Sequence, residues 1–128
     1  MFSKRSSLVA LCIWLAFAQG CRNEPLLDLT LAHEVSPQPP RVGPVTITLR
    51  LTDTAGGQVD GARITLEANM SHAGMVPVFA DARETEPGRY QSTVELTMAG
   101  DWFILVHVSL TNGRKLDRQF EIKGVALQ

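Results

Sequence analysis

The six residues from Met70 to Met75 carry the most distinctive side-chain chemistry in this chain. Met70, His72 and Met75 place two thioethers and one imidazole within this stretch, a clustering that no strand or turn requires. In an extended backbone, residues i and i+2 point to the same side with Cα atoms roughly 6.5 to 7 Å apart, so Met70 and His72 can approach one small ion. Met75 joins them only if the chain turns back at Ala73-Gly74, which the glycine permits.

Two thioethers and an imidazole form a soft donor set without carboxylates. Such a set favours Cu(I) over zinc, calcium or magnesium, so copper is the expected metal. Met98 is a candidate fourth ligand. The imidazole must be neutral to bind, whereas thioethers do not titrate. Affinity is therefore expected to weaken, without vanishing, as the pH falls through the range near 6.

A purely structural interpretation of the same residues stays open. Methionine is a common core filler, and strand parity places Met70 and Met98 on the inward side. His72 then caps the loop or lies in solvent, while His33 and His107 are more simply strand residues. In that case the chain is a metal-free, immunoglobulin-like accessory or interaction module of a transporter or envelope complex.

The sequence does not favour an enzyme. Ser71 and His72 are adjacent, which is the wrong arrangement for a catalytic triad, where an oriented base must reach the hydroxyl through space. The chain shows no cysteine nucleophile, carboxylate cluster or glycine-rich phosphate loop. We therefore expect no catalytic residues.

The N-terminus follows the pattern of a bacterial export signal. Lys4 and Arg5 precede an apolar run of eleven residues from Leu8 to Ala18, which is shorter than the about 20 residues that a membrane-spanning helix needs. The run ends in Ala18-Gln19-Gly20-Cys21, which resembles a lipobox, so Cys21 is the predicted lipidation site. Cleavage before Cys21 would remove 20 of the 128 residues and leave 108, a length that suits one domain.

We therefore predict a signal peptide over residues 1–20, a lipidated tether over 21–25 and one domain over 26–128. Burial of an acyl chain is worth about 0.8 kcal/mol per methylene, so several chains on Cys21 would hold the domain at a membrane. Arg22 is not the aspartate that retains such proteins at the inner membrane, which weakly favours the outer membrane and a periplasmic domain. With Cys12 in the signal and Cys21 lipidated, no cysteine pair remains for a disulfide.

Charge excludes one class of partner. Twelve basic and thirteen acidic residues give a formal net charge of −1, and both signs are scattered along the chain. Nucleic-acid binding would require a clustered basic surface. We expect no nucleic-acid partner.

Period-two alternation of apolar and polar residues recurs along the chain, as in half-buried strands. In 45–52, for example, Val45, Ile47, Leu49 and Leu51 face one way, with polar residues between them. A type I′ turn is predicted at Asn112-Gly113, and turns at Glu86-Pro87-Gly88 and Ala99-Gly100-Asp101. The predicted strands are 26–34, 45–52, 62–69, 75–80, 90–98, 102–110 and 116–123.

These strands, their short spacing and the absence of a helical period after the signal predict an all-β fold. The expected architecture is an immunoglobulin-like antiparallel β-sandwich of about seven strands. The segment Ser36–Pro40, rich in prolines that cannot donate ladder hydrogen bonds, is expected at an edge or crossover.

With these residues in view, the chain resembles the YtkA-like family, which is related to FixH-type proteins. The resemblance covers about residues 29–124 and is carried by an ordered set of short motifs. They are the Pro-rich entry at 36–43, the turn at 53–62, the Met-rich loop at 70–75, Pro87-Gly88-Arg89-Tyr90 and Met98-Ala99-Gly100-Asp101-Trp102.

The resemblance implies an extracytoplasmic β-sandwich linked by association to copper handling and to assembly of copper-containing respiratory oxidases. The methionines of the family's loop match Met70 and Met75, and its methionine before the Gly-x-Trp turn matches Met98. His72 matches a histidine that only some members carry. The implied partners are the membrane, through Cys21, and a copper-transport or respiratory oxidase assembly protein.

Overall fold

The computed structural model describes residues 29–72 and 74–128, which form seven β-strands. The signal and lipidation predictions for residues 1–20, Cys21 and 21–25 lie outside the described residues, as does Ala73. In chain order the strands are β1 (Thr30–Ser36), β2 (Gly43–Thr52), β3 (Arg63–Met70), β4 (Val78–Glu86), β5 (Arg89–Leu96), β6 (Gly100–Ser109) and β7 (Lys115–Val125).

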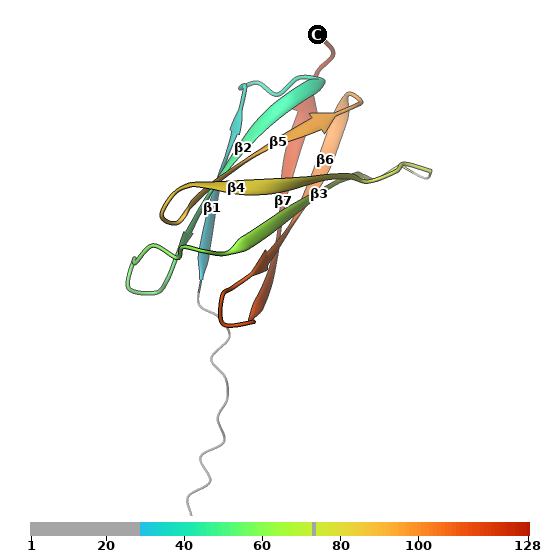
Figure 1. The fold of residues 1–128 in the computed structure, drawn as a ribbon. Helices are drawn as coiled ribbons and strands as arrows, with labels where there is room; N and C mark the ends of the chain where they lie inside the picture. The colour runs from blue at the N-terminus through green and yellow to red at the C-terminus, as the bar shows by residue number, and fades with distance from the viewer. Residues whose placement is uncertain (1–28, 73) are drawn as a thin grey trace, which may run out of the picture.

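All the strand pairs are antiparallel, in the order β1-β2-β5-β4-β3-β6-β7. Strand β4 links two layers, because residues 78–82 pair with β3 whereas 83–86 pair with β5. In Figure 1, β3 and β4 run side by side across the other strands. The continuous sheet therefore divides at β4 into one layer of β1-β2-β5-β4 and another of β3-β6-β7. This is the strand arrangement of a constant-type immunoglobulin sandwich, and it confirms the predicted all-β class.

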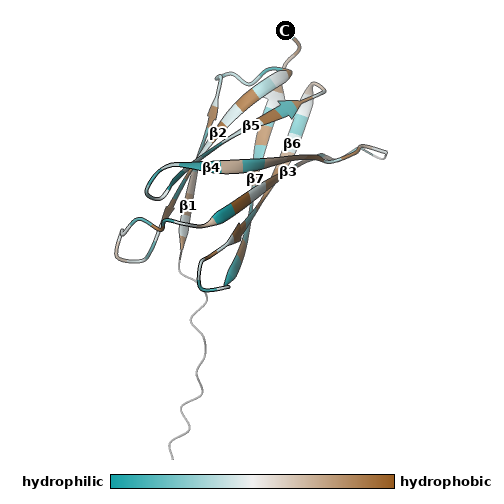
Figure 2. Cartoon of the chain, viewed as in Figure 1, coloured by the Kyte–Doolittle hydropathy of each residue, from teal (hydrophilic) through white to brown (hydrophobic). Residues whose placement is uncertain are grey.

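The core lies between the two layers and is built by strand alternation. Figure 2 shows hydrophobic and hydrophilic positions alternating along the strands. The inward side chains of β2, β3, β5 and β6 are almost fully buried, as their parity predicted. The largest of them are Trp102, Tyr90, Ile47, Leu49, Leu51, Ile64, Leu66, Leu96 and Ile104.

Tyr90 of β5 ties the core to the segment that precedes β3. Its hydroxyl donates a hydrogen bond to the Val59 carbonyl at 2.8 Å and accepts one from the Ala62 N–H at 3.1 Å. Both backbone groups thereby gain a partner inside the sandwich, as buried polar groups must. Burial raises the pKa of Tyr90 to about 12.

The proline-rich segment after β1 joins two neighbouring strands of one layer and pairs on its way with the end of β7 in the other, in agreement with its predicted place at an edge. The Val42 N–H donates to the Ala126 carbonyl at 2.8 Å, and the Ala126 N–H donates to the Pro40 carbonyl at 3.1 Å. A parallel bridge between Arg41 and Ala126 accompanies these bonds. The end of β7 is therefore fixed against the start of β2.

The observed bounds of every strand differ by at least one residue from the predicted ones. Strand β1 extends to Ser36, two residues past the predicted end, and its predicted start at residue 26 lies outside the described residues. Strand β4 spans Val78–Glu86 instead of 75–80. Its inward residues Ala80 and Ala82 are small and its outward residues include Phe79, so β4 lacks the apolar alternation that marks the other strands.

Two local predictions were wrong. Strand β5 ends at Leu96, so its parity does not extend to Met98, which is 46% exposed instead of inward. At the β6–β7 hairpin, Gly113 has a φ of +84° but Asn112 has a negative φ. The Gly113 N–H donates to the Leu110 carbonyl at 3.0 Å, which makes a type I turn followed by a left-handed glycine, not type I′.

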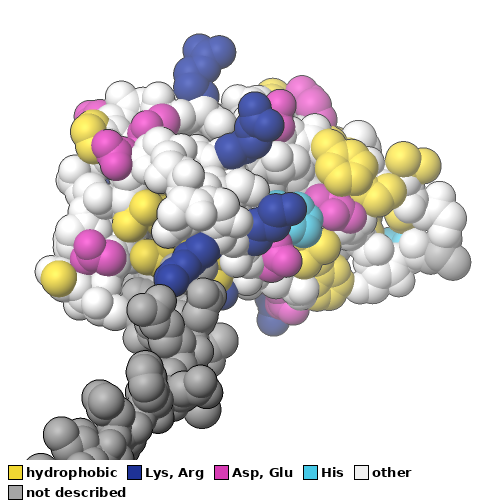
Figure 3. Space-filling model, turned by 60° about the horizontal axis from the view of Figure 1, so that its bottom comes forward, with side chains coloured by type: hydrophobic (Ala, Val, Ile, Leu, Met, Phe, Trp, Pro, Cys, Tyr) yellow, Lys and Arg dark blue, Asp and Glu magenta, His cyan; other side chains and the backbone are white. Residues whose placement is uncertain are grey.

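Over residues 29–72 and 74–128, no helix is long and apolar enough to cross a membrane. Basic and acidic side chains are interspersed on the face that Figure 3 presents.

Candidate functional site: the methionine end of the sandwich

The loop after β3 carries the predicted metal ligands away from the layers. Strands β3 and β4 run out to a projecting loop at the right of Figure 1. The loop bends as predicted: the Met75 N–H donates to the His72 carbonyl at 3.4 Å, and Gly74 has a φ of +83°. A side chain other than hydrogen would be strained at that φ, so Gly74 permits the turn that brings Met75 back toward the sandwich.

Met70, the last residue of β3, is buried at the mouth of the core. Only 7% of it is exposed, so its predicted inward orientation is confirmed. It lies opposite Trp102 in the β3–β6 register. A β-carbon at Gly100 would lie 2.9 Å from the terminal methyl carbon of Met70, so the absence of a side chain at Gly100 makes room for this thioether.

Met98 lies at the same end of the sandwich, in the short connection between β5 and β6. Its carbonyl accepts a hydrogen bond of 2.9 Å from the indole N–H of Trp102. Trp102 is also the register partner of Met70, so the backbones of both methionines lie beside Trp102. Met98 and Met70, two of the predicted ligands, therefore lie at the same end of the sandwich, with Trp102 as their shared neighbour.

His72 and Met75 complete the candidate site with contrasting exposure. His72 is exposed on the projecting loop, whereas Met75 is half-buried and packs against the core residues. The site thus has a buried thioether, a half-buried one, a half-exposed one and an imidazole in solvent. The three thioethers and the imidazole remain a soft donor set, which suits Cu(I).

Harder metal chemistry has less support at this end. Within the described residues, no three histidine, cysteine, aspartate or glutamate side chains converge into a group that could hold a metal ion. A site at this end of the sandwich would therefore depend on its thioethers. The predicted ligand roles of Met70, His72, Met75 and Met98 stay predictions.

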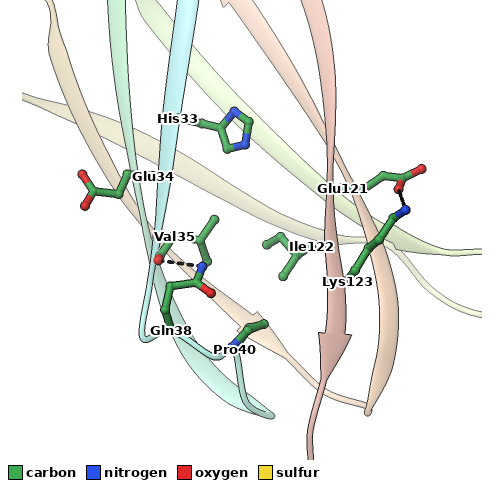
Figure 4. A pocket seen from close by; sticks show the side chains of 8 residues that line it. All are labelled: His33, Glu34, Val35, Gln38, Pro40, Glu121, Ile122 and Lys123. Carbon is green, nitrogen blue, oxygen red and sulfur yellow. Dashed lines mark hydrogen bonds and ion pairs between the residues drawn. The ribbon is translucent and has the colours of Figure 1, made fainter.

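A second feature is a cleft of about 370 Å³ between the edge strands β1 and β7. Figure 4 shows His33 and Ile122 pointing toward each other across it, with Glu34 turned away. His33 stacks on Phe120 with ring centroids 3.9 Å apart, and burial lowers the pKa of His33. None of the residues that line this cleft is a methionine, so the cleft is distinct from the candidate copper site at the Met70 loop.

Two supporting residues of the methionine end were not predicted as such. Gly100 makes room for Met70, and Trp102 fixes the carbonyl of Met98. The sequence signal was the run from Met98 to Trp102, which was interpreted as a turn and as one of the motifs of the family resemblance. The supporting role of Gly100 and Trp102 depends on the pairing of β3 with β6, which the alternation of apolar and polar residues does not determine.

The fold and this loop together define an immunoglobulin-like β-sandwich domain with three methionines at one end. The YtkA-like family model matches residues 29–107, well over half of the chain and a range that includes all four predicted ligands. The chain belongs to the YtkA-like family. Comparison with curated proteins gave no match.

Proposed function

We propose that this protein is a membrane-tethered, extracytoplasmic copper-binding protein that holds Cu(I) through Met70, His72 and Met75. Membership of the YtkA-like family supports an extracytoplasmic accessory domain. Copper binding goes beyond what family membership supports, and it is inferred from the donor atoms of the loop. Cu(I) is the cargo in this proposal, passed to a partner or sequestered.

The observation that supports the proposal is that three methionines lie at one end of the sandwich. Met70 ends β3, and Met75 follows a turn and packs against the core. The Met98 carbonyl accepts a hydrogen bond from the indole N–H of Trp102, which is the register partner of Met70. Only Met70 lies in a strand, so strand packing does not require methionine at the other two positions. The shared property of the three residues is the thioether, which is a ligand for soft ions.

The exposure gradient suits exchange of the ion. His72 lies in solvent and Met98 is 46% exposed, so a partner's ligands can approach from outside. Met70 supplies an inner donor whose position is limited by Gly100. Ligands on a loop above a rigid sandwich allow release, because the loop can move without disturbing the layers.

Tethering and partners complete the proposal. The export signal over residues 1–20 and the lipidation site at Cys21 would place the domain in the periplasm, at the outer membrane in the weakly favoured case. The protein partner would be a copper-transport or respiratory oxidase assembly protein. Detection of an acylated Cys21 by mass spectrometry of the envelope form would support the tether, and a free thiol at a cleaved N-terminus would contradict it.

The binding test is Cu(I) titration against a bathocuproine-type competitor. Met70→Leu/Met75→Leu removes both sulfurs while nearly conserving core volume, so the fold should survive. The wild type should retain copper at competitor concentrations that strip the double variant. His33→Gln, which removes an imidazole outside the loop, is the matched control and should behave as wild type. Equal, weak competition by wild type and double variant would contradict the proposal.

A second candidate function is a metal-free accessory module of a transporter or envelope complex. The observation that favours it is exposed apolar surface beside the loop, where Val76 is 79% and Phe79 64% exposed. Isolated exposed apolar residues are common, but two this close suit a protein contact. Cross-linking from position 79 in intact envelopes tests it: a specific adduct that is independent of copper and of Met70 and Met75 would favour the module.

A further inference from the structure

A row of polar side chains crosses the outer face of β3, β6 and β7. The His107 side chain of β6 lies between those of Asp117, its register partner in β7, and Glu67, which is diagonal to it in β3. Its Nδ1 is 2.8 Å from Oδ1 of Asp117, and its Nε2 is 3.4 Å from Oε2 of Glu67. The other Glu67 oxygen, Oε1, accepts a hydrogen bond of 3.1 Å from the Asn69 side-chain amide. Each member of the row is thus held by a neighbour.

These contacts determine the form of the neutral imidazole. A carboxylate only accepts hydrogen bonds, so the short contact to Asp117 places the proton on Nδ1. The Nε2 lone pair then faces an oxygen of the Glu67 carboxylate. Two such electron pairs repel unless a cation lies between them. A metal ion bound to both atoms would fill that role.

The spacing matches a pair of metal ligands. Bonds of about 2.1 Å to nitrogen and oxygen, at a tetrahedral angle, separate two donors by about 3.4 Å. This is the distance from Nε2 of His107 to Oε2 of Glu67. The outer contacts also fit, because a metal-binding imidazole usually donates its other N–H to a carboxylate, and a binding carboxylate is itself hydrogen-bonded. Asp117 and Asn69 supply those two contacts.

We propose that His107 Nε2 and Glu67 Oε2 bind a divalent transition-metal ion of the Zn²⁺ class, with Asp117 and Asn69 as positioning residues. An imidazole with a carboxylate suits such ions, in contrast to the thioethers at the methionine end. The His107 side chain is 44% and the Glu67 side chain 22% exposed, so water can complete the coordination. The site is thus a two-ligand, exchangeable one, in keeping with the absence of a three-ligand group in the described part of the chain.

The test is Zn²⁺ titration of the full chain at about pH 8, followed by calorimetry. One equivalent should bind to the wild type. His107→Gln should abolish this binding, and Asp117→Asn should weaken it about 10- to 100-fold by loss of the orienting contact. His33→Gln retains the row and should bind as the wild type does. The result that overturns the proposal is equal binding by wild type and His107→Gln, or an equal loss in His33→Gln.

A second readout does not depend on affinity. Zn²⁺ should shift the ring NMR signals of His107 before those of His33 and His72, and the shift should persist in Met70→Leu/Met75→Leu. Persistence there separates this site from the proposed Cu(I) site, so each can fail alone. A first response at His33 or His72 would overturn the assignment to His107.

Discussion

Gly100 and the terminal methyl of Met70 are in such close contact that a β-carbon at position 100 would lie 2.9 Å from the methyl carbon. This contact joins the start of β6 to the end of β3, the point where the candidate copper loop begins. Any side chain at position 100 must displace Met70. The contact therefore connects a backbone position with the proposed inner ligand and can be tested from the glycine side.

Gly100→Ala should disturb both stability and copper affinity. Gly100 has a φ of +127°, so alanine there costs about 1–3 kcal/mol of backbone strain, and it also forces the terminal methyl of Met70, the flexible end of that side chain, to move. Gly113→Ala is the matched control, because Gly113 also has a positive φ, +84°, but no atom lies within 4 Å of the added carbon. Urea denaturation should show the larger loss for Gly100→Ala, and Cu(I) competition should weaken only in that variant. Equal stability losses and unchanged copper affinity would disprove the proposed role of this contact.

Tyr90→Phe should destabilise the fold although the ring is retained. Without the hydroxyl, the Val59 carbonyl and the Ala62 N–H lose their partner, at a cost of about 1–3 kcal/mol. Chemical denaturation at neutral pH measures this directly. A change below about 0.3 kcal/mol would mean that water replaces the hydroxyl and that the clamp is not energetically important.

Tyr90 should also give the fold an alkaline limit. Its pKa is raised to about 12 in the folded state, and an unfolded tyrosine titrates at about 10. The proton-bound form is thus favoured by folding, so this stabilisation is complete below about pH 10 and is lost as the pH rises toward 12. Denaturation midpoints measured from pH 9 to about 12 should fall less steeply in Tyr90→Phe than in the wild type. Parallel curves would contradict the account.

The two strand histidines should respond to pH with opposite signs. Hydrogen bonds to Asp117 and Glu67 raise the pKa of His107, so its contribution is present below about pH 6.5 and is lost as the pH rises through the raised value. Burial lowers the pKa of His33, so its contribution is lost as the pH falls below about 6.5. Denaturation at about pH 5.5 and 8 should show that His107→Gln loses most in acid, whereas His33→Gln gains relative stability there. The same sign in both variants would contradict these contacts.

Alternation along the strands predicted most of the fold. The buried faces of 45–52, 62–69 and 102–110 match the inward residues of β2, β3 and β6, because period-two apolar spacing directly reports one buried side. Strand β4 was too short in the prediction, since small Ala80 and Ala82 carry its inward face. Its exchange between layers depends on pairing with both β3 and β5, which no local pattern encodes.

The candidate site was predictable only where it depends on local sequence. Residue type and spacing singled out Met70, His72 and Met75, and the turn at Gly74 was expected from glycine chemistry. The inward orientation predicted for Met98 was wrong, because β5 stops two residues earlier. The row of Glu67, His107 and Asp117 required the register of three strands, and side chains 40 and 10 residues apart meet only once that register is known.

The most direct test of the central claim is X-ray absorption at the copper edge of the protein loaded with one equivalent of Cu(I). The account predicts a first shell dominated by sulfur with one nitrogen donor, and loss of the sulfur scattering in Met70→Leu/Met75→Leu. A wild-type shell made only of nitrogen and oxygen donors, or a sulfur shell unchanged in the double variant, would contradict it.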